Sequence, residues 1–192
     1  MLFGQLRKAI VDFFIDDGVL LNPANLVLLG FDVEKATSVL NHFKGLPVRD
    51  LDQHLAPRAG LRILAAEDNP TNQLILRALL EPLDIELTMV GNGLEAVAAQ
   101  ASGDFDLVLM DAQMPEMNGI DAAAEIRRRE RATGARRTPI IALTANVMRH
   151  QVDSYLEAGM DGVVAKPIEL PVLIAAIDAA LAEPTPEASV AA

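Results

Sequence analysis

Residues 106–119 read DLVLMDAQMPEMNG, a short apolar run that ends on an acid, Asp111. Three other apolar runs also end on polar or charged residues: residues 61–66 before Glu67 and Asp68, 140–143 before Thr144, and 163–165 before Lys166. Short runs of this kind are typical of buried strands. Ligands of an open parallel sheet bind at the carboxyl ends of its strands, so we expect these polar residues to share one crevice.

From residue 61 onward, strand-like runs alternate with amphipathic stretches. Strands are predicted at residues 61–66, 85–90, 106–110, 139–143 and 162–165. Helices are predicted after Asn69, an N-cap followed by Pro70, and around residues 94–98, 120–126, 147–156 and 169–182. This alternation predicts an α/β domain at residues 61–183, in which right-handed crossovers join a doubly wound, five-stranded parallel sheet.

The two ends of the chain have other patterns. Apolar residues recur at helical spacing within residues 2–14 and 33–43, which predicts a small helical extension over residues 1–60. Pro47, Pro57 and Gly60 mark its linker to the main domain. Nothing in the sequence gives the extension a function. Residues 184–192 are predicted to be a disordered tail.

Composition restricts the partners. A net charge of −11 argues against binding to the phosphate backbone of nucleic acid. The sequence contains no Cys, which excludes disulfides and thiolate metal sites and is compatible with the cytoplasm. No stretch has the roughly 18 charge-free apolar residues of a membrane span, and residues 1–15 lack the apolar core of a signal peptide. We therefore expect a cytoplasmic protein that binds neither nucleic acid nor membrane.

The chemistry expected of the crevice follows from its charges. Three converging carboxylates need a compensating cation, and a site made of oxygen ligands favours Mg²⁺, or Mn²⁺, over zinc. Lys166 would supply a fixed positive charge and Thr144 a hydrogen-bond donor to a phosphoryl group. Asp111, at the centre of the set, is the candidate nucleophile because a carboxylate can accept a phosphoryl group as an acyl phosphate.

These segments resemble the receiver domain of two-component response regulators, and most closely the hybrid histidine kinase type. The resemblance extends over residues 61–183 and is carried by four pieces: AEDN at 66–69, LMDAQMPEMNG at 109–119, LTA at 143–145 and KP at 166–167. It implies a flavodoxin-like sheet of order 2-1-3-4-5 and a cis Lys166–Pro167 bond. It also implies a phosphohistidine donor on a histidine kinase or histidine phosphotransfer protein.

The resemblance also implies residue roles. Asp111 would be the phosphoacceptor, Thr144 would bind a phosphoryl oxygen, and Lys166 would pair with it. Asp68, Asp111 and the backbone carbonyl of Gln113 would bind Mg²⁺ directly, with Glu67 acting through water.

Two positions depart from the family pattern. Asn118 replaces an acid that is common before Gly119. Val163 stands where the family has Tyr or Phe, a ring that swings inward when the threonine engages the phosphoryl group. We therefore expect that no large ring fills the space behind Thr144 when this residue moves. The response should appear mainly as ordering of residues 144–148 and a shift of the fourth helix, carried to the surface made by the fourth helix, fifth strand and fifth helix.

Two other functions share part of this pattern. A haloacid dehalogenase-like phosphatase also uses an Asp nucleophile and Mg²⁺, but has a second Asp two residues later, where this chain has Gln113. A phosphorylation-independent pseudo-receiver that acts as an adaptor would be expected to lack an acid or the lysine, and this chain keeps them all.

Three further features have ordinary explanations. The arginines that follow the third predicted helix are expected to be a solvated face: Arg127, Arg128, Arg129, Arg131, Arg136 and Arg137. His42 faintly resembles a phosphotransfer histidine, but its motif is one residue short. The small apolar residues on the outer side of the last helix leave open a partner surface, and a homodimer could form there or through the N-terminal helices.

Overall fold

The structure, a computed structural model, describes residues 60–145 and 148–182. Within them lies a five-stranded parallel sheet with the order β2-β1-β3-β4-β5. Its strands are β1 Arg62–Ala66, β2 Glu86–Val90, β3 Leu107–Asp111, β4 Ile140–Thr144 and β5 Gly162–Ala165. The predicted α/β class and the flavodoxin-like strand order are both confirmed.

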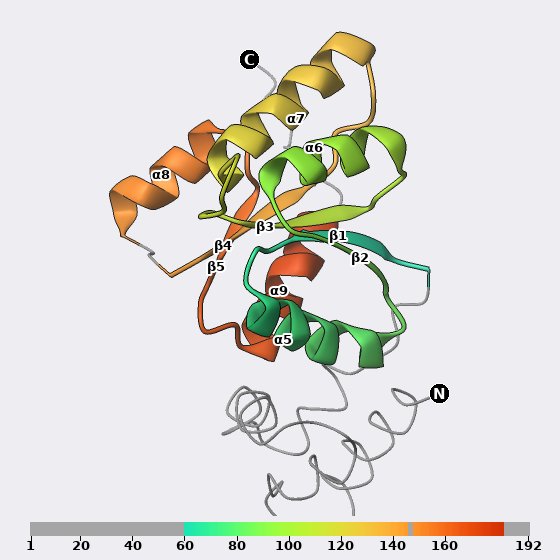
Figure 1. The fold of residues 1–192 in the computed structure, drawn as a ribbon, viewed down its shortest axis with the longest axis vertical. Helices are drawn as coiled ribbons and strands as arrows, with labels where there is room; N and C mark the ends of the chain where they lie inside the picture. The colour runs from blue at the N-terminus through green and yellow to red at the C-terminus, as the bar shows by residue number, and fades with distance from the viewer. Residues whose placement is uncertain (1–59, 146–147, 183–192) are drawn as a thin grey trace, which may run out of the picture.

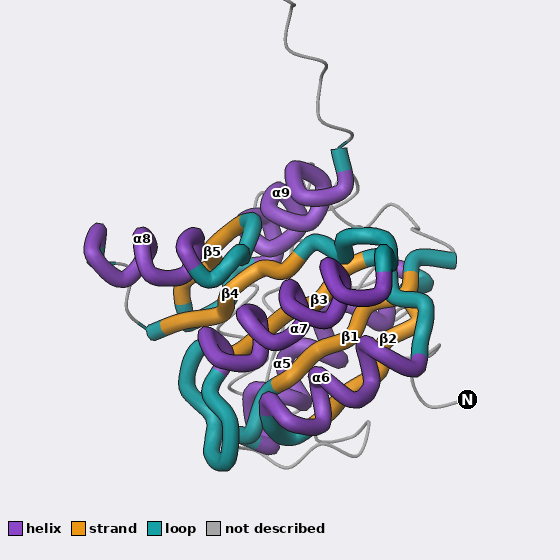
Figure 2. Tube along the Cα trace, turned by 90° about the horizontal axis from the view of Figure 1, so that it is seen from above, coloured by secondary structure: helices purple, strands orange, loops and turns teal. Residues whose placement is uncertain are grey.

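Helices cover both faces of this sheet (Figure 1). One face carries α6 Gly93–Ser102, α7 Gly119–Thr133 and α8 Arg149–Glu157, and the other carries α5 Pro70–Leu80 and α9 Leu170–Leu181. Seen from above, α6 and α7 lie across the sheet while α8 lies beside β5 at its edge (Figure 2). The helix after β4 therefore covers the margin of the sheet rather than its centre.

Each face of the sheet has its own apolar core. Along β1, Ile63 and Ala65 pack with residues of α5 and α9, whereas Leu64 and Ala66 pack with residues of α6 and α7. This alternation follows from the period of two in a strand. Because both faces are covered, β1 and β3 are apolar at nearly every position, which is the continuous pattern that the sequence shows.

Asparagine side chains begin the helices that follow the first three strands. Asn69 Oδ1 accepts the backbone N–H of Thr71 at 2.8 Å, with Pro70 at the first helical position, as predicted. Asn92 and Asn118 cap α6 and α7 in the same way. Asn69 and Asn92 come within three residues of a strand end, and Asn118 closes the longer loop after β3, so all three caps fix loops at the carboxyl edge of the sheet.

The structure refines several predicted boundaries. A 3₁₀ helix, η1 Glu81–Leu83, follows α5 and was not predicted. Asp111 and Thr144 are the last residues of β3 and β4 rather than the first residues after them. The helix predicted from residue 147 begins at Arg149, and residue 147 itself lies outside the described part of the chain.

The predictions for residues 1–60, His42 and residues 184–192 fall outside the described residues, apart from Gly60. In the part that is described, no helix is long and apolar enough to cross a membrane.

Candidate functional site

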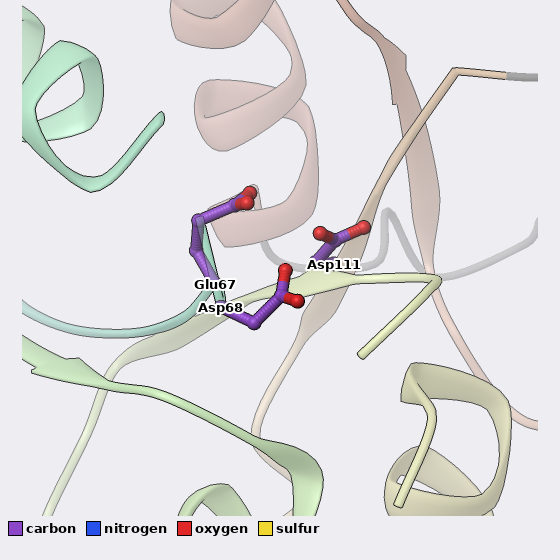
Figure 3. A group of neighbouring side chains, drawn as sticks. All are labelled: Glu67, Asp68 and Asp111. Atoms are coloured by element: carbon purple, nitrogen blue, oxygen red, sulfur yellow. The ribbon is translucent and has the colours of Figure 1, made fainter. Parts of the chain in front are cut away.

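Three carboxylates meet at the carboxyl edge of the sheet (Figure 3). Ala66 of β1 is in register with Met110 of β3, so the next residues, Glu67 and Asp111, come side by side. Asp68 follows directly, and one carboxylate oxygen from each of the three acids lies within 4.8 Å of the others. The structure thus brings together the acids that the strand-end pattern predicted.

Glu67 is the fixed member of this cluster. Its side chain is fully buried, and its Oε1 accepts hydrogen bonds from Asn72 Nδ2 at 2.9 Å and from the Asn69 backbone N–H at 3.3 Å. Burial raises the pKa of Glu67, although hydrogen bonds from Lys166 and Asn72 act in the opposite direction. A buried carboxylate with three hydrogen-bond donors cannot readily turn toward a ligand. Glu67 therefore acts mainly through its effect on the electrostatic potential of the site.

Asp68 and Asp111 differ in access. Asp68 is exposed, whereas Asp111 is only 5% exposed. Asp111 Oδ1 accepts the backbone N–H of Gln113 at 3.1 Å, which orients the carboxylate. An open groove is lined by Asp68 and by Ala112, the residue after Asp111, together with Gln113, Met114, Pro115, Asn118, Ile120, His150, Gln151, Ser154 and Tyr155. A partner molecule can therefore approach Asp68 from this side.

Lys166 joins the two buried acids. Its Nζ lies 2.7 Å from Glu67 Oε2 and 2.7 Å from Asp111 Oδ2. Burial alone would lower the pKa of the ammonium, but the hydrogen bonds to Asp111 and Glu67 outweigh it, so the pKa of Lys166 is raised. Lys166 is therefore positively charged at neutral pH. The Lys166–Pro167 peptide bond is cis, as the resemblance implied.

Thr144 is placed on the neighbouring strand end. It is 3% exposed, and its carbonyl oxygen accepts the backbone N–H of Lys166 at 2.7 Å. The residue before it, Leu143, is in register with Asp111 across β3 and β4. Thr144 thus lies on the strand between the phosphoacceptor candidate and the lysine candidate.

The loop after Asp111 is held closely against its strand. Gly119, the first residue of α7, is buried, and its N–H donates to the carbonyl of Ala112 at 3.2 Å. A Cβ added at Gly119 would collide with the backbone carbonyl oxygen of Asp111. Residues 112–118 therefore return the chain to within backbone contact of the acid.

The similarity of this chain to known proteins agrees with this arrangement of residues. Residues 63–178 match the family model of the response regulator receiver domain. The chain belongs to this family. Sensor protein GacS of Pseudomonas syringae pv. syringae is 43% identical over 119 residues, which cover 62% of this chain and 13% of GacS. The chain thus corresponds to a small part of that much longer relative.

Two solved receiver structures are informative. The receiver domain of sensor histidine kinase PA1611 from Pseudomonas aeruginosa PAO1 is 37% identical, with a TM-score of 0.58 over 64% of this chain and 98% of that one. It has a magnesium ion coordinated in its active-site cleft. The receiver domain of Ssk1 from Saccharomyces cerevisiae, solved with the histidine phosphotransfer protein Ypd1, is 33% identical. Its TM-score is 0.57 over 59% of this chain and 83% of that one.

One contact of Thr144 was not predicted. Val163 leaves no aromatic ring on β5, but a tyrosine of α8 reaches Thr144. The hydroxyl of Tyr155 lies 2.9 Å from Thr144 Oγ1, and Tyr155 is 4% exposed. Val163 packs against the same core cluster that contains Tyr155.

The arginine run also departs from expectation. Arg127 is buried, and its guanidinium donates to Glu130 Oε2 at 2.7 Å, to Asp161 Oδ2 at 3.0 Å and to the carbonyl of Gly159 at 2.9 Å. Arg137 adds a bond to Asp161 Oδ1 at 2.6 Å. The prediction of a solvated face is wrong for Arg127, which joins α7 to the turn before β5, at the end of the sheet opposite the crevice.

The remaining arginines are exposed or half-buried. Arg128 and Arg129 both pair with Glu125, and together they hold its pKa at about 2. These contacts lie on the surface of α7 and bring no arginine to the acidic cluster.

Proposed function

We propose that this chain accepts a phosphoryl group on Asp111 from a phosphohistidine and signals through protein contacts. The observation that carries the proposal is the Lys166 ammonium 2.7 Å from a carboxylate oxygen of Asp111, beside two further acids. A carboxylate in this setting is held in place next to a positive charge that can meet an incoming phosphoryl group.

The residues present also fit a divalent cation. Two carboxylates about 4 Å apart repel by roughly 4 kcal/mol at an effective dielectric near 20. One ammonium against three carboxylates leaves this repulsion only partly offset. The donors are all oxygens, as Mg²⁺ prefers. We propose that Asp68, Asp111 and the carbonyl of Gln113 hold Mg²⁺ or Mn²⁺, with Glu67 acting through water. The bound ion would neutralise charge on the phosphoryl oxygens.

The proposed transfer is a substitution at phosphorus. A carboxylate oxygen of Asp111 forms a bond to phosphorus while the P–N bond of the phosphohistidine breaks, and the imidazole leaves with the electrons of that bond. Lys166 stabilises the negative charge that arrives at Asp111. The hydroxyl of Thr144, one strand away, donates to a phosphoryl oxygen. Water later hydrolyses the acyl phosphate slowly, so turnover beyond this self-modification is not expected.

The donor is proposed to be a histidine kinase or a histidine phosphotransfer protein. The receiver of Ssk1, 33% identical to this chain, was solved with such a protein. The open groove lined by Asp68 and by Ala112, the residue after Asp111, offers a surface on which a donor protein could dock. The cognate donor, the downstream partner and the cytoplasmic location stay predictions, as does a homodimer through the exposed residues of α9.

The two alternatives are less well supported. Gln113, the residue two positions after Asp111, is exposed and has no acidic proton to give a leaving group, which argues against a phosphatase. A pseudo-receiver has no need for a lysine bonded to both buried acids, and this chain has one.

Intact mass after incubation with acetyl phosphate and Mg²⁺ tests the proposal. The wild-type chain should gain the mass of one phosphoryl group, and chelation of Mg²⁺ should prevent the gain. Asp111→Asn should show none, while Asp104→Asn, an exposed acid outside the cluster, should behave as wild type. A full gain in Asp111→Asn would move the phosphoacceptor elsewhere.

A further inference from the structure

Of the residues of α8, all of them described, Tyr155 is the one that is buried. Its ring packs in the core cluster that contains Ala142 and Met160, while its hydroxyl reaches Thr144 Oγ1 on β4. The helix is otherwise polar or half-exposed. Its position on the sheet therefore depends largely on this single ring and its hydroxyl contact.

The hydrogen bond between the two hydroxyls can run in either direction. A hydroxyl has one hydrogen to donate and two lone pairs that accept, and either oxygen of this pair could be the donor. A buried phenol normally keeps a hydrogen-bond partner, because losing it leaves an unsatisfied polar group. We therefore expect the Tyr155 hydroxyl to move with the Thr144 hydroxyl.

A phosphoryl group on Asp111 removes this freedom. A phosphoryl oxygen is a charged acceptor and competes strongly for the hydrogen of Thr144. Once Thr144 donates to it, Tyr155 must donate to Thr144, so one direction of the pair remains. Any displacement of Thr144 toward Asp111 would therefore also displace the side chain of Tyr155, which belongs to α8.

Tyr155 also lines the groove described above, together with Ser154, Gln151 and His150 of α8 and with Asp68 and Gln113. A shift of Tyr155 therefore changes the wall of the groove that Asp68 also lines.

We propose that Tyr155 reads the phosphorylation state of Asp111 through Thr144 and transmits it to α8 and the groove. This inference rests on the proposed phosphorylation of Asp111 and adds Tyr155 and α8 as the part of the structure that responds to it. Tyr155 is a positioning residue here, since it touches Thr144 and not the reacting atoms.

The chain itself supplies the spectroscopic probe. It has one tyrosine and no tryptophan, so its near-ultraviolet tyrosine absorption and fluorescence come from Tyr155 alone. Addition of beryllofluoride, a phosphoryl mimic, with Mg²⁺ to the full wild-type chain should change this signal. Mg²⁺ alone should not reproduce the change. Thermal stabilisation by the mimic, measured on the same sample, establishes that it is bound.

Tyr155→Phe gives the second test, because it keeps the ring and removes the hydroxyl. It should gain the phosphoryl mass from acetyl phosphate as wild type does, yet lose the change in amide exchange of α8 that the mimic induces in wild type. Leu156→Ala, at the exposed neighbouring position, should keep that change.

The outcomes separate the two proposals. A wild-type chain that gains the mass and binds the mimic while its tyrosine signal stays unchanged overturns the role of Tyr155 alone. A wild-type exchange response in Tyr155→Phe does the same. A wild-type chain that neither gains the mass nor binds the mimic overturns the phosphoryl-accepting function, and the role of Tyr155 with it.

Discussion

The ammonium of Lys166 lies 2.7 Å from Oδ2 of Asp111, although the two residues are 55 positions apart in the sequence. The parallel order of β3, β4 and β5 produces this contact, because it sets the ends of the three strands next to one another. Lys166 also bonds Glu67, so one side chain ties the end of β5 to the ends of β1 and β3.

Lys166→Met should destabilise the chain in the absence of Mg²⁺. The substitution keeps an apolar stem but leaves Glu67 and Asp111 unpaired in a buried site. Breaking a fully buried ion pair costs about 3–5 kcal/mol, and the partial exposure of Lys166 reduces the expected loss to about 1–3 kcal/mol. Urea unfolding measures it. Arg128→Met, which removes an exposed pair on α7, should change stability far less, because exposed ion pairs contribute little; equal losses would contradict the structural role of Lys166.

Asp68→Ala should abolish most of the stabilisation by Mg²⁺. Asp68 is the exposed member of the acidic cluster, so its loss removes a proposed Mg²⁺ ligand without opening the core. A ligand present at 100 times its dissociation constant stabilises by about 2.7 kcal/mol, which thermal unfolding with and without Mg²⁺ can resolve. Asp104→Ala serves as the matched exposed acid. Mg²⁺ stabilisation that survives Asp68→Ala would place the metal elsewhere.

Arg127→Met should be among the more destabilising substitutions in α7. It leaves Glu130, with a side chain only 5% exposed, without its guanidinium partner. Breaking a buried ion pair costs about 3–5 kcal/mol, and the N–H of Thr138, which still donates to Glu130 Oε1, should keep the loss near the lower value. The control is Arg131→Met, at an exposed position on the same helix. The difference between the unfolding free energies of the two variants, measured by chemical unfolding, gives the effect of burial. Because the network lies away from the crevice, the phosphoryl mass gain should persist under conditions where the variant is folded.

Glu81→Gln should stabilise the chain near neutral pH. Burial raises the pKa of Glu81 above 4.5, Arg77 offsets this only in part, and Oε2 of Glu81 is buried without a hydrogen-bond partner. A raised folded pKa means that wild-type stability falls as pH rises through that pKa. The neutral amide avoids this loss. We expect a gain of about 0.5–1 kcal/mol at about pH 7, after allowance for solvent screening.

The same gain should disappear at a pH below 4.5, where Glu81 is protonated in both the folded and the unfolded chain. Unfolding curves at the two pH values test the sign. Glu157→Gln, at an exposed glutamate, controls for the change in net charge. A gain that is equal at both pH values would show that charge burial is not its cause.

The sheet and its acidic edge could be predicted because they depend on local patterns. A strand covered on both faces is a short apolar run, and the residue that ends it must lie at the carboxyl edge. Asp111 and Lys166 could therefore be brought together without knowledge of any side-chain contact. The sequence predicted that they meet, and the contacts show that the lysine bonds two acids at once.

Tyr155 and Arg127 could not be placed in this way. Whether a helical residue is buried depends on how its helix is rotated on the sheet, and α8 has too few apolar residues to reveal that rotation. Arg127 looks like its exposed neighbours because its partners, Gly159 and Asp161, lie more than 30 residues away. Contacts of this range leave no periodicity in the sequence.

Gly119 has a consequence for protein engineering. Any Cβ at this position would collide with the carbonyl of Asp111. The loop between β3 and α7 therefore has no room for a side chain where it meets the start of α7. A chimaera that exchanges α7 for the helix of another receiver must therefore join the two parents after Gly119 and keep the loop at its present length. Chimaeras with another junction or loop length should fold, but with Asp111 displaced from its position. Sequence identity elsewhere in the helix would not restore that position.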